Sequence, residues 1–167
     1  MKKISIIYGS TTDNTKDTAE KIAEQLKDFC PKIKDVAKCN ADDFTDADFL
    51  ILGTSTWGAG ELQDDWYGML LQLKSVDLSD KTVALFGLGD SNGYSDTFVD
   101  GMGELYKFFN GKNCKIIGSV STMEYCFDYS SAVIDGEFVG LPIDADNESE
   151  LTDERVADWV QNIKQSF

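Results

Sequence analysis

The chain has 167 residues, 42% of them hydrophobic and only two of them proline, which suits one domain with a single core and excludes a disordered or collagen-like chain. Its net charge of −15 opposes binding to nucleic acid or anionic membrane and favours a basic partner, although solubility alone would also explain it. Because no apolar run approaches the roughly 18–20 residues that span a bilayer, and the one behind the N-terminal lysines ends at Ile7, we expect a soluble cytoplasmic protein without a signal peptide.

The first half of the chain alternates predicted strands and helices. Residues 3–8 form an apolar, β-branched run that ends at Gly9, which predicts a buried strand. The apolar residues of 15–29 then recur at helical spacing, and Pro31 lies just beyond this predicted helix. The remaining elements of this half are a polar edge strand, an apolar strand covered on both faces and a short helix, at 32–36, 49–53 and 62–73.

The second half continues this alternation until one segment interrupts it. We predict a buried strand at 81–86, a helix at 98–109, a fifth strand at 115–120 and a final helix at 151–167. Such repeated βαβ units indicate an α/β fold, a doubly wound parallel sheet with helices on both faces. The segment 121–138 is rich in aromatic, acidic and glycine residues, and we interpret it as an inserted loop that interrupts the last strand.

A cluster of hydroxyl side chains follows the first predicted strand. Ligands of open α/β sheets bind at the carboxyl ends of strands, and the positive end of a helix there favours a phosphate. The chain has neither a Walker loop nor a GxGxxG motif at this place, and helix capping alone is the alternative reading. Because a carboxylate fits a phosphate poorly, we expect the Asp13 side chain to point outward. The other members of the cluster are Ser10, Thr11, Thr12, Asn14 and Thr15.

Two glycine-bounded loops each carry one aromatic residue. Trp57 lies in the loop 55–60 after the third strand, and Tyr94 lies in the loop 87–94 after the fourth. Because the carboxyl ends of parallel strands meet at one edge of a sheet, the two rings could hold a planar ligand between them. Together with the phosphate site, they indicate a phosphorylated planar heterocycle, FMN before a nucleotide. The alternatives are a Trp57 folded back on its own sheet and a simple turn in the second loop.

These loops resemble the FMN-binding loops of the flavodoxins, and the resemblance extends over the whole chain. It implies one FMN-binding domain over 1–167, with a five-stranded sheet of order 2-1-3-4-5 that is a general property of that fold. The segment 121–138 resembles the loop that distinguishes long-chain from short-chain flavodoxins. The matching motifs are the hydroxyl loop, Thr56-Trp57-Gly58-Ala59-Gly60-Glu61-Leu62, Gly89-Asp90 with Gly93-Tyr94, and Phe138-Val139-Gly140-Leu141.

The resemblance also implies cofactor-binding roles for particular residues. Trp57 and Tyr94 are similar to the two aromatic residues that sandwich the flavin ring. The phosphate would be bound by backbone amides of the loop that includes Asp13 and by the side chains of Ser10, Thr11, Thr12, Asn14 and Thr15. The flavin and ribityl groups would be contacted by Ser55, Thr56, Gly58, Ala59, Gly60, Leu88, Gly89, Asp90, Phe98, Asp100 and Asp146.

The function that the resemblance implies is a low-potential one-electron carrier that binds FMN non-covalently. It would shuttle between semiquinone and hydroquinone FMN and need no catalytic residue or metal of its own, because the cofactor supplies the chemistry. The expected partners are basic-surfaced redox proteins, with an NAD(P)H-dependent flavodoxin reductase or a 2-oxoacid oxidoreductase as donor and reductive enzymes as acceptors. The protein itself is expected to be a monomer.

Other functions need features that the chain lacks or would have to show. An FMN-dependent NAD(P)H or quinone oxidoreductase of the same fold would need one flavin face uncovered, and a phosphoacceptor receiver domain would need paired acids where Tyr8-Gly9-Ser10 stands. The absence of histidine excludes Ser-His-Asp triads, HExxH zinc sites and histidine phosphotransfer. Because the four cysteines lack CxxC spacing, we expect reduced thiols, with a disulfide or metal site as the alternative.

Overall fold

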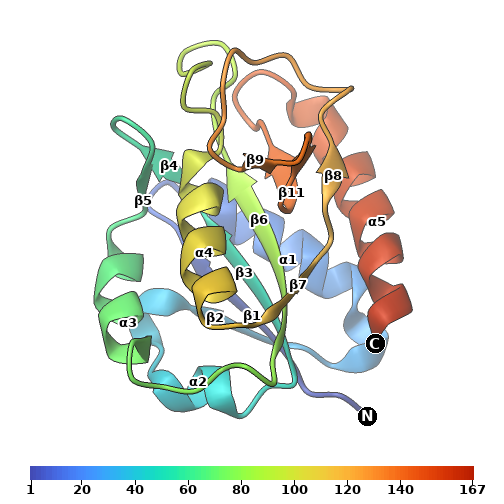
Figure 1. The fold of residues 1–167 in the computed structure, drawn as a ribbon. Coiled ribbons are helices and arrows are strands. Elements are labelled where there is room, and N and C mark those ends of the chain that lie inside the picture. The colour runs from blue at the N-terminus through green and yellow to red at the C-terminus, as the bar shows by residue number, and fades with distance from the viewer.

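The central sheet is parallel, and its strand order is the doubly wound one. In the computed structural model, which describes residues 1–167, the order across the sheet is β2–β1–β3–β6–β11 (Figure 1). Ile6 of β1 pairs with Ile33 on one side and with Ile51 on the other, so β1 lies inside the sheet, as its apolar sequence predicts. The predicted five-strand order is therefore confirmed. In the order of the sheet, the strands span Lys32–Asp35, Ile4–Gly9, Phe49–Thr54, Thr82–Leu88 and Leu141–Ile143.

The fifth position in the sheet is shared by two short strands. β7 (Lys115–Ile117) pairs with the first half of β6, and β11 pairs with its second half. The predicted strand at 115–120 ends early because Gly118 takes a left-handed φ of 86°, and a Cβ there would lie 2.8 Å from Trp159 Nε1. The last strand is thus interrupted, as predicted.

The segment that interrupts the last strand has strands of its own. Its members form a three-stranded antiparallel sheet in the order β8–β10–β9. The sequence predicts only a loop here, because strands of two residues are too short to show alternation. Their bounds are Val120–Ser121 for β8, Val133–Ile134 for β9 and Glu137–Phe138 for β10.

Helices cover both faces of the sheet (Figure 1). α1 (Asn14–Gln25) and α5 (Thr152–Ile163) lie on one face, and α3 (Asp65–Leu73) and α4 (Asp100–Gly111) lie on the other. α4 begins two residues later than predicted, because Val99 has a left-handed φ of 50°. Smaller elements are α2 (Ala41–Thr45), the hairpin of β4 (Thr56–Trp57) and β5 (Glu61–Leu62), and 3₁₀ turns at Lys27–Phe29, Val36–Lys38, Ser149–Leu151 and Lys164–Ser166.

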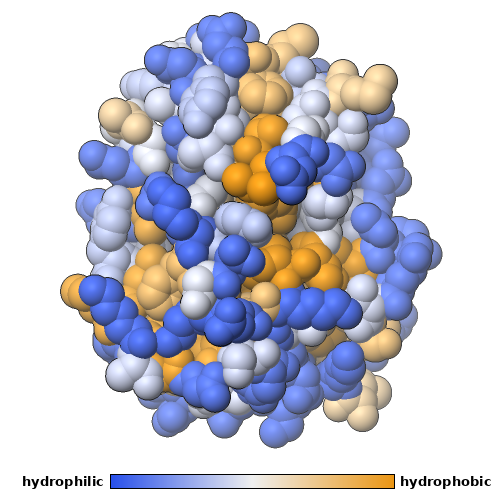
Figure 2. All heavy atoms as spheres, in the orientation of Figure 1, coloured by the Kyte–Doolittle hydropathy of each residue, from blue (hydrophilic) through white to orange (hydrophobic).

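The alternation of side chains along the strands builds two apolar layers. In β3, Phe49 and Ile51 pack with α1 and α5, whereas Leu50 and Leu52 pack with α3 and α4. The surface is mainly hydrophilic, but apolar atoms gather between α4 and α5, over the edge strand β7 (Figure 2). No helix of the structure has the length and apolar character that crossing a membrane requires.

Candidate functional site

A cleft of about 250 Å³ opens at the carboxyl ends of the central strands. This is the edge at which ligands of doubly wound sheets bind, because the loops after several strands converge there. Most of the residues that the sequence indicates for a cofactor site lie in its wall. The lining residues are Thr12, Asn14, Ser55, Thr56, Trp57, Gly58, Leu88, Gly89, Asp90, Tyr94, Thr97, Ala145 and Asp146.

The hydroxyl loop between β1 and α1 holds polar atoms that have no partner. Ser10 Oγ and Thr15 Oγ1 are buried and make no hydrogen bond. Buried hydroxyls are nearly always hydrogen-bonded in folded proteins, so these two fit a ligand with acceptor oxygens. The start of α1 adds backbone N–H groups, since no side chain caps this helix. Asp13 is exposed at a left-handed φ of 69°, which agrees with the expected outward side chain.

The side chain of Gln63 forms a hydrogen bond with the hydroxyl loop. This side chain is buried, and its Nε2 donates to Asp65 Oδ2 (2.7 Å) and to Thr11 Oγ1 (3.4 Å). Because the Thr11 oxygen accepts this hydrogen bond, its own proton is free to point away from Gln63. The sequence offers no signal for this contact, since Gln63 lies far from the loop along the chain.

Two large rings in the lining of the cleft remain exposed. Trp57 is 41% exposed and Tyr94 is 58% exposed, although both are large side chains that proteins usually bury. Trp57 Nε1 donates to Ser55 Oγ (2.8 Å), which fixes the indole at the tip of the β4–β5 hairpin. That tip turns through Gly58 and Gly60, whose φ values of 52° and 97° suit glycine. The arrangement offers two aromatic faces to a planar ligand.

Thr97 is a cleft residue that the sequence does not indicate. Its hydroxyl is buried without a hydrogen-bond partner, and the residue lines the cleft three positions after Tyr94. A planar ligand with polar edge atoms would satisfy it. Ala145 also lines the cleft, between the acids Asp144 and Asp146. The only signal in the sequence for Thr97 and Ala145 is their closeness along the chain to Tyr94 and Asp146.

Three carboxylates lie near one end of the cleft. Hydrogen bonds hold the pKa of Asp90 below its usual value. The largest contribution comes from the Gly93 N–H and the next from the Asn147 amide. Burial raises the pKa of Asp146, and the negative charges of Asp90 and Asp144 raise it further. Such like charges make this end of the cleft unfavourable for an added negative charge.

Other predicted site residues lie beside or beneath the cleft. Phe98 is only 1% exposed and packs against Tyr125, Phe127 and Phe138, so the structure places it in the core beneath the Tyr94 loop. Ala59 and Gly60 lie on the hairpin outside the lining, as do Ser10, Thr11, Asp13 and Thr15 on the hydroxyl loop.

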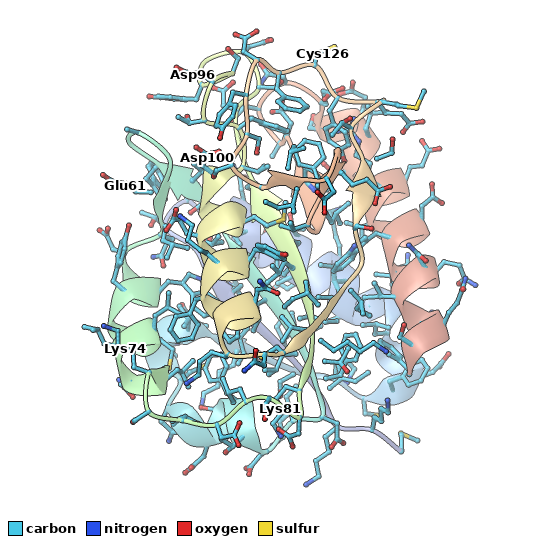
Figure 3. All side chains as sticks on the ribbon, in the orientation of Figure 1. Glu61, Lys74, Lys81, Asp96, Asp100 and Cys126 are labelled. Carbon is cyan, nitrogen blue, oxygen red and sulfur yellow. The ribbon has the colours of Figure 1, made fainter.

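Asp100 also lies beside the cleft, at the start of α4 (Figure 3). Its carboxylate accepts a hydrogen bond from the Ser131 N–H (2.8 Å), and burial raises its pKa. Figure 3 shows Glu61, Asp96 and Asp100 at the end of the molecule that carries the cleft, and Lys74 and Lys81 at the opposite end. Three of the labelled acids thus lie at the end that carries the cleft.

Comparisons with known proteins agree on one family. The profile of the flavodoxin family matches residues 6–159. A flavodoxin from Nostoc sp. is 41% identical over 166 residues, covering 99% of this chain and 98% of that protein. Flavodoxin 1 from Azotobacter vinelandii is 41% identical over 171 residues, covering 100% of this chain and 98% of that protein. The crystal structure of Fusobacterium nucleatum flavodoxin bound to flavin mononucleotide superposes with a TM-score of 0.95 at 32% identity, covering 100% of this chain and 99% of that one.

Proposed function

The chain belongs to the flavodoxin family, and on this premise we propose that its cleft binds one FMN and uses it to carry electrons. The protein is a low-potential electron carrier rather than an enzyme. FMN, when bound, supplies the redox chemistry by gaining and losing one electron at a time. The observation that supports FMN most directly is a pair of unpartnered buried hydroxyls, Ser10 and Thr15, near a cleft walled by two exposed aromatic rings.

The residues present fit each part of FMN. The hydroxyls of Ser10 and Thr15 and the free N–H groups at the start of α1 would bind the phosphate, which needs several donors. Trp57 and Tyr94 would stack on the two faces of the ring and exclude water from it. The unpartnered Thr97 hydroxyl would serve a polar edge of the ring.

The acidic residues near the cleft would tune the cofactor. A reduced ring that gains negative charge is destabilised by carboxylates such as Asp90 and Asp146, which lowers the potential for its reduction. The chain has no lysine or arginine from Thr54 to Glu61 or from Gly87 to Asp100 that could offset this repulsion. The protein environment therefore favours a strongly reducing carrier.

A comparison of FMN with riboflavin tests this proposal. We expect the purified protein to bind one FMN tightly, as measured by quenching of flavin fluorescence, and riboflavin much more weakly because it lacks the phosphate. A redox titration of the FMN complex should give two one-electron potentials. We expect the more negative of them to lie well below the corresponding potential of free FMN. Equal affinities for the two flavins would contradict the assigned role of the hydroxyl loop. A potential equal to that of free FMN would contradict the assigned role of the acids.

The acids around the cleft also indicate the kind of partner. Glu61, Asp64, Asp65 and Asp96 are exposed, and they would attract a redox protein with a basic surface, such as a flavodoxin reductase or a 2-oxoacid oxidoreductase. We place this exchange in the cytoplasm and expect the carrier to act as a monomer. The association rate should fall steeply with salt, because the Debye length is only about 8 Å at physiological ionic strength.

Matched variants test whether the partner recognises this surface. Neutralising Glu61, Asp64 and Asp96 together should slow association with a basic reductase at low salt. Neutralising Glu20, Glu24 and Asp28, which lie in the second half of α1 and just beyond it, removes the same number of charges and should change the rate much less. Equal effects of the two sets would show that net charge alone, and not a docking surface, controls the rate.

A further inference from the structure

One side chain outside the cleft connects two of the loops that form it. Asn147 follows β11 and donates from Nδ2 to Asp90 Oδ1 (2.8 Å) and to Asp144 Oδ1 (3.0 Å), while its Oδ1 accepts from Asn92 Nδ2 (2.9 Å). It does not line the cleft. We propose that Asn147 is a positioning residue that fastens the Tyr94 loop to the end of β11 and so holds the Tyr94 ring against the flavin. The part of this inference that concerns flavin rests on the proposed function.

The fixed end of this connection is the buried carboxylate of Asp144. Asp144 is only 1% exposed and comes directly after β11, so its position is set by the sheet. It accepts hydrogen bonds from the Asn147 N–H (3.0 Å), the Ser91 N–H (3.2 Å) and the Ser91 hydroxyl. Ser91 and Asn147 therefore connect the loops around the cleft to the end of the sheet through two separate sets of hydrogen bonds.

The movable end of the connection is the loop that carries Tyr94. The Asp90 carboxylate accepts hydrogen bonds from the N–H groups of Gly93 (2.8 Å) and Asn92 (3.1 Å), and the Asp90 carbonyl accepts one from the Tyr94 N–H (2.9 Å). Hydrogen bonds thus lead without a break from Asp144 through Asn147 and Asp90 to Tyr94. Because the Tyr94 ring is 58% exposed, the backbone of this loop has a large part in deciding where the ring lies.

The chemistry of an amide suits this place. An asparagine side chain has two N–H donors and an acceptor oxygen, and here the donors meet two carboxylates while the oxygen meets an amide. Leucine, of similar size, would remove the amide that donates to both the Asp90 and the Asp144 carboxylates. Since Asn147 itself lies at the surface, its replacement should loosen the loop and leave the fold intact.

The first test uses the apoprotein and does not depend on flavin. In Asn147→Leu, we expect amide hydrogen exchange of Gly93 and Tyr94 to become at least several-fold faster than in the wild type. Asn162→Leu, an exposed change on α5, is the matched control and should leave this exchange unchanged. Unchanged exchange in Asn147→Leu would overturn the proposed fastening, whether or not the protein binds FMN.

The second test asks whether Asn147 acts through the Tyr94 ring. Asn147→Leu should weaken FMN and riboflavin by the same factor of about tenfold, since Tyr94 would contact the ring and not the phosphate. In a Tyr94→Ala background, the same change should cost less than twofold, because the ring that it positions is gone. A full tenfold loss in that background would overturn the inference. A wild-type protein that bound neither flavin would instead contradict the proposed function, while the exchange test would still judge the fastening.

Discussion

The two sides of the cleft are built in opposite ways. On the side of the hydroxyl loop, Ser10 Oγ and Thr15 Oγ1 are buried without hydrogen-bond partners. On the side of the acidic loops, Asp90 and Asp144 each accept several hydrogen bonds from the loops around them. An unpaired buried hydroxyl is unfavourable until a ligand arrives, whereas a paired carboxylate stabilises the loops in advance. The first side therefore provides affinity and the second provides shape.

The largest expected effect comes from removing the unpaired hydroxyls. Ser10→Ala combined with Thr15→Val should weaken FMN binding by more than 100-fold, because each hydrogen bond to a charged group contributes about 1.5–3 kcal/mol. Riboflavin affinity should hardly change. The free energy of unfolding of the apoprotein, from urea titration, should stay the same or rise slightly, since no hydrogen bond within the protein is lost.

Thr18→Val is the matched control for the hydroxyl loop. Thr18 is buried one turn further along α1, but its hydroxyl already donates to the Asn14 carbonyl (3.0 Å). Its loss should leave FMN affinity near the wild-type value. If the double variant kept its FMN affinity and lost stability instead, the contrast between the two sides would be wrong.

The second effect concerns the stability of the acidic side. Asp144→Ala removes the acceptor for the Ser91 and Asn147 donors, and it should lower the free energy of unfolding of the apoprotein by about 3 kcal/mol. Asp146→Ala, two residues away and without a hydrogen bond, should change it by less than about 0.5 kcal/mol. Urea unfolding of both variants measures the difference, and similar values would show that the carboxylate of Asp144 does not organise this side.

A third effect comes from removing a charge near the cleft without removing a hydrogen bond. Asp146 lines the cleft and makes no hydrogen bond, so Asp146→Asn should change the electrostatic field and little else. At an effective dielectric of about 20, a carboxylate about 10 Å away contributes roughly 1.7 kcal/mol, which corresponds to about 70 mV. We therefore expect the more negative potential of bound FMN to rise by a few tens of mV at pH 8. Asp28→Asn, far from the cleft, should leave it unchanged, and an equal shift in both variants would mean that only net charge matters.

The smallest effect separates two carboxylates by the sign of their pKa shifts. The pKa of Asp90 is lowered, so its stabilisation is present above its ordinary value of 3.8 and is lost as the pH falls through the folded-state pKa. The pKa of Asp100 is raised by burial, so its stabilisation is present below 3.8 and is lost as the pH rises through the folded-state pKa.

These signs predict opposite outcomes for two conservative variants. At pH 7, Asp90→Asn should lower the free energy of unfolding of the apoprotein, and Asp100→Asn should raise it slightly. Unfolding titrations from pH 3 to pH 7 would reveal both trends. Changes of the same sign at pH 7 would show that hydrogen-bond geometry, and not ionisation, decides the contribution of these groups.

Local patterns in the chain were enough to predict the frame of the cleft. The apolar runs at β1, β3 and β6 predict buried parallel strands, and the polar or glycine-rich segments directly behind them predict the loops at their carboxyl ends. Trp57, Tyr94 and the hydroxyls lie in those loops, so their approach to one edge follows from the topology. The strand order itself came from the resemblance to flavodoxins.

Features that depend on contacts between distant residues could not be predicted in this way. Phe98 lies four residues after Tyr94 along the chain, yet its ring lies in the core because Tyr125, Phe127 and Phe138 of the inserted segment surround it. The early end of β7 depends on the indole of Trp159, which lies 41 residues further along the chain. Neither neighbour is visible in a local window of sequence.

The sequence by itself therefore determined the βαβ frame, the acidic character and the chemical types at the cleft, because these depend on periodicity and composition. Only the tertiary structure decided which polar groups are paired. Ser10 and Asp144 are both polar residues near the end of a strand, but the first has no partner and the second has several. Pairing depends on distances of about 3 Å between loops that meet only after folding, and it is this pairing that separates a binding residue from a positioning one.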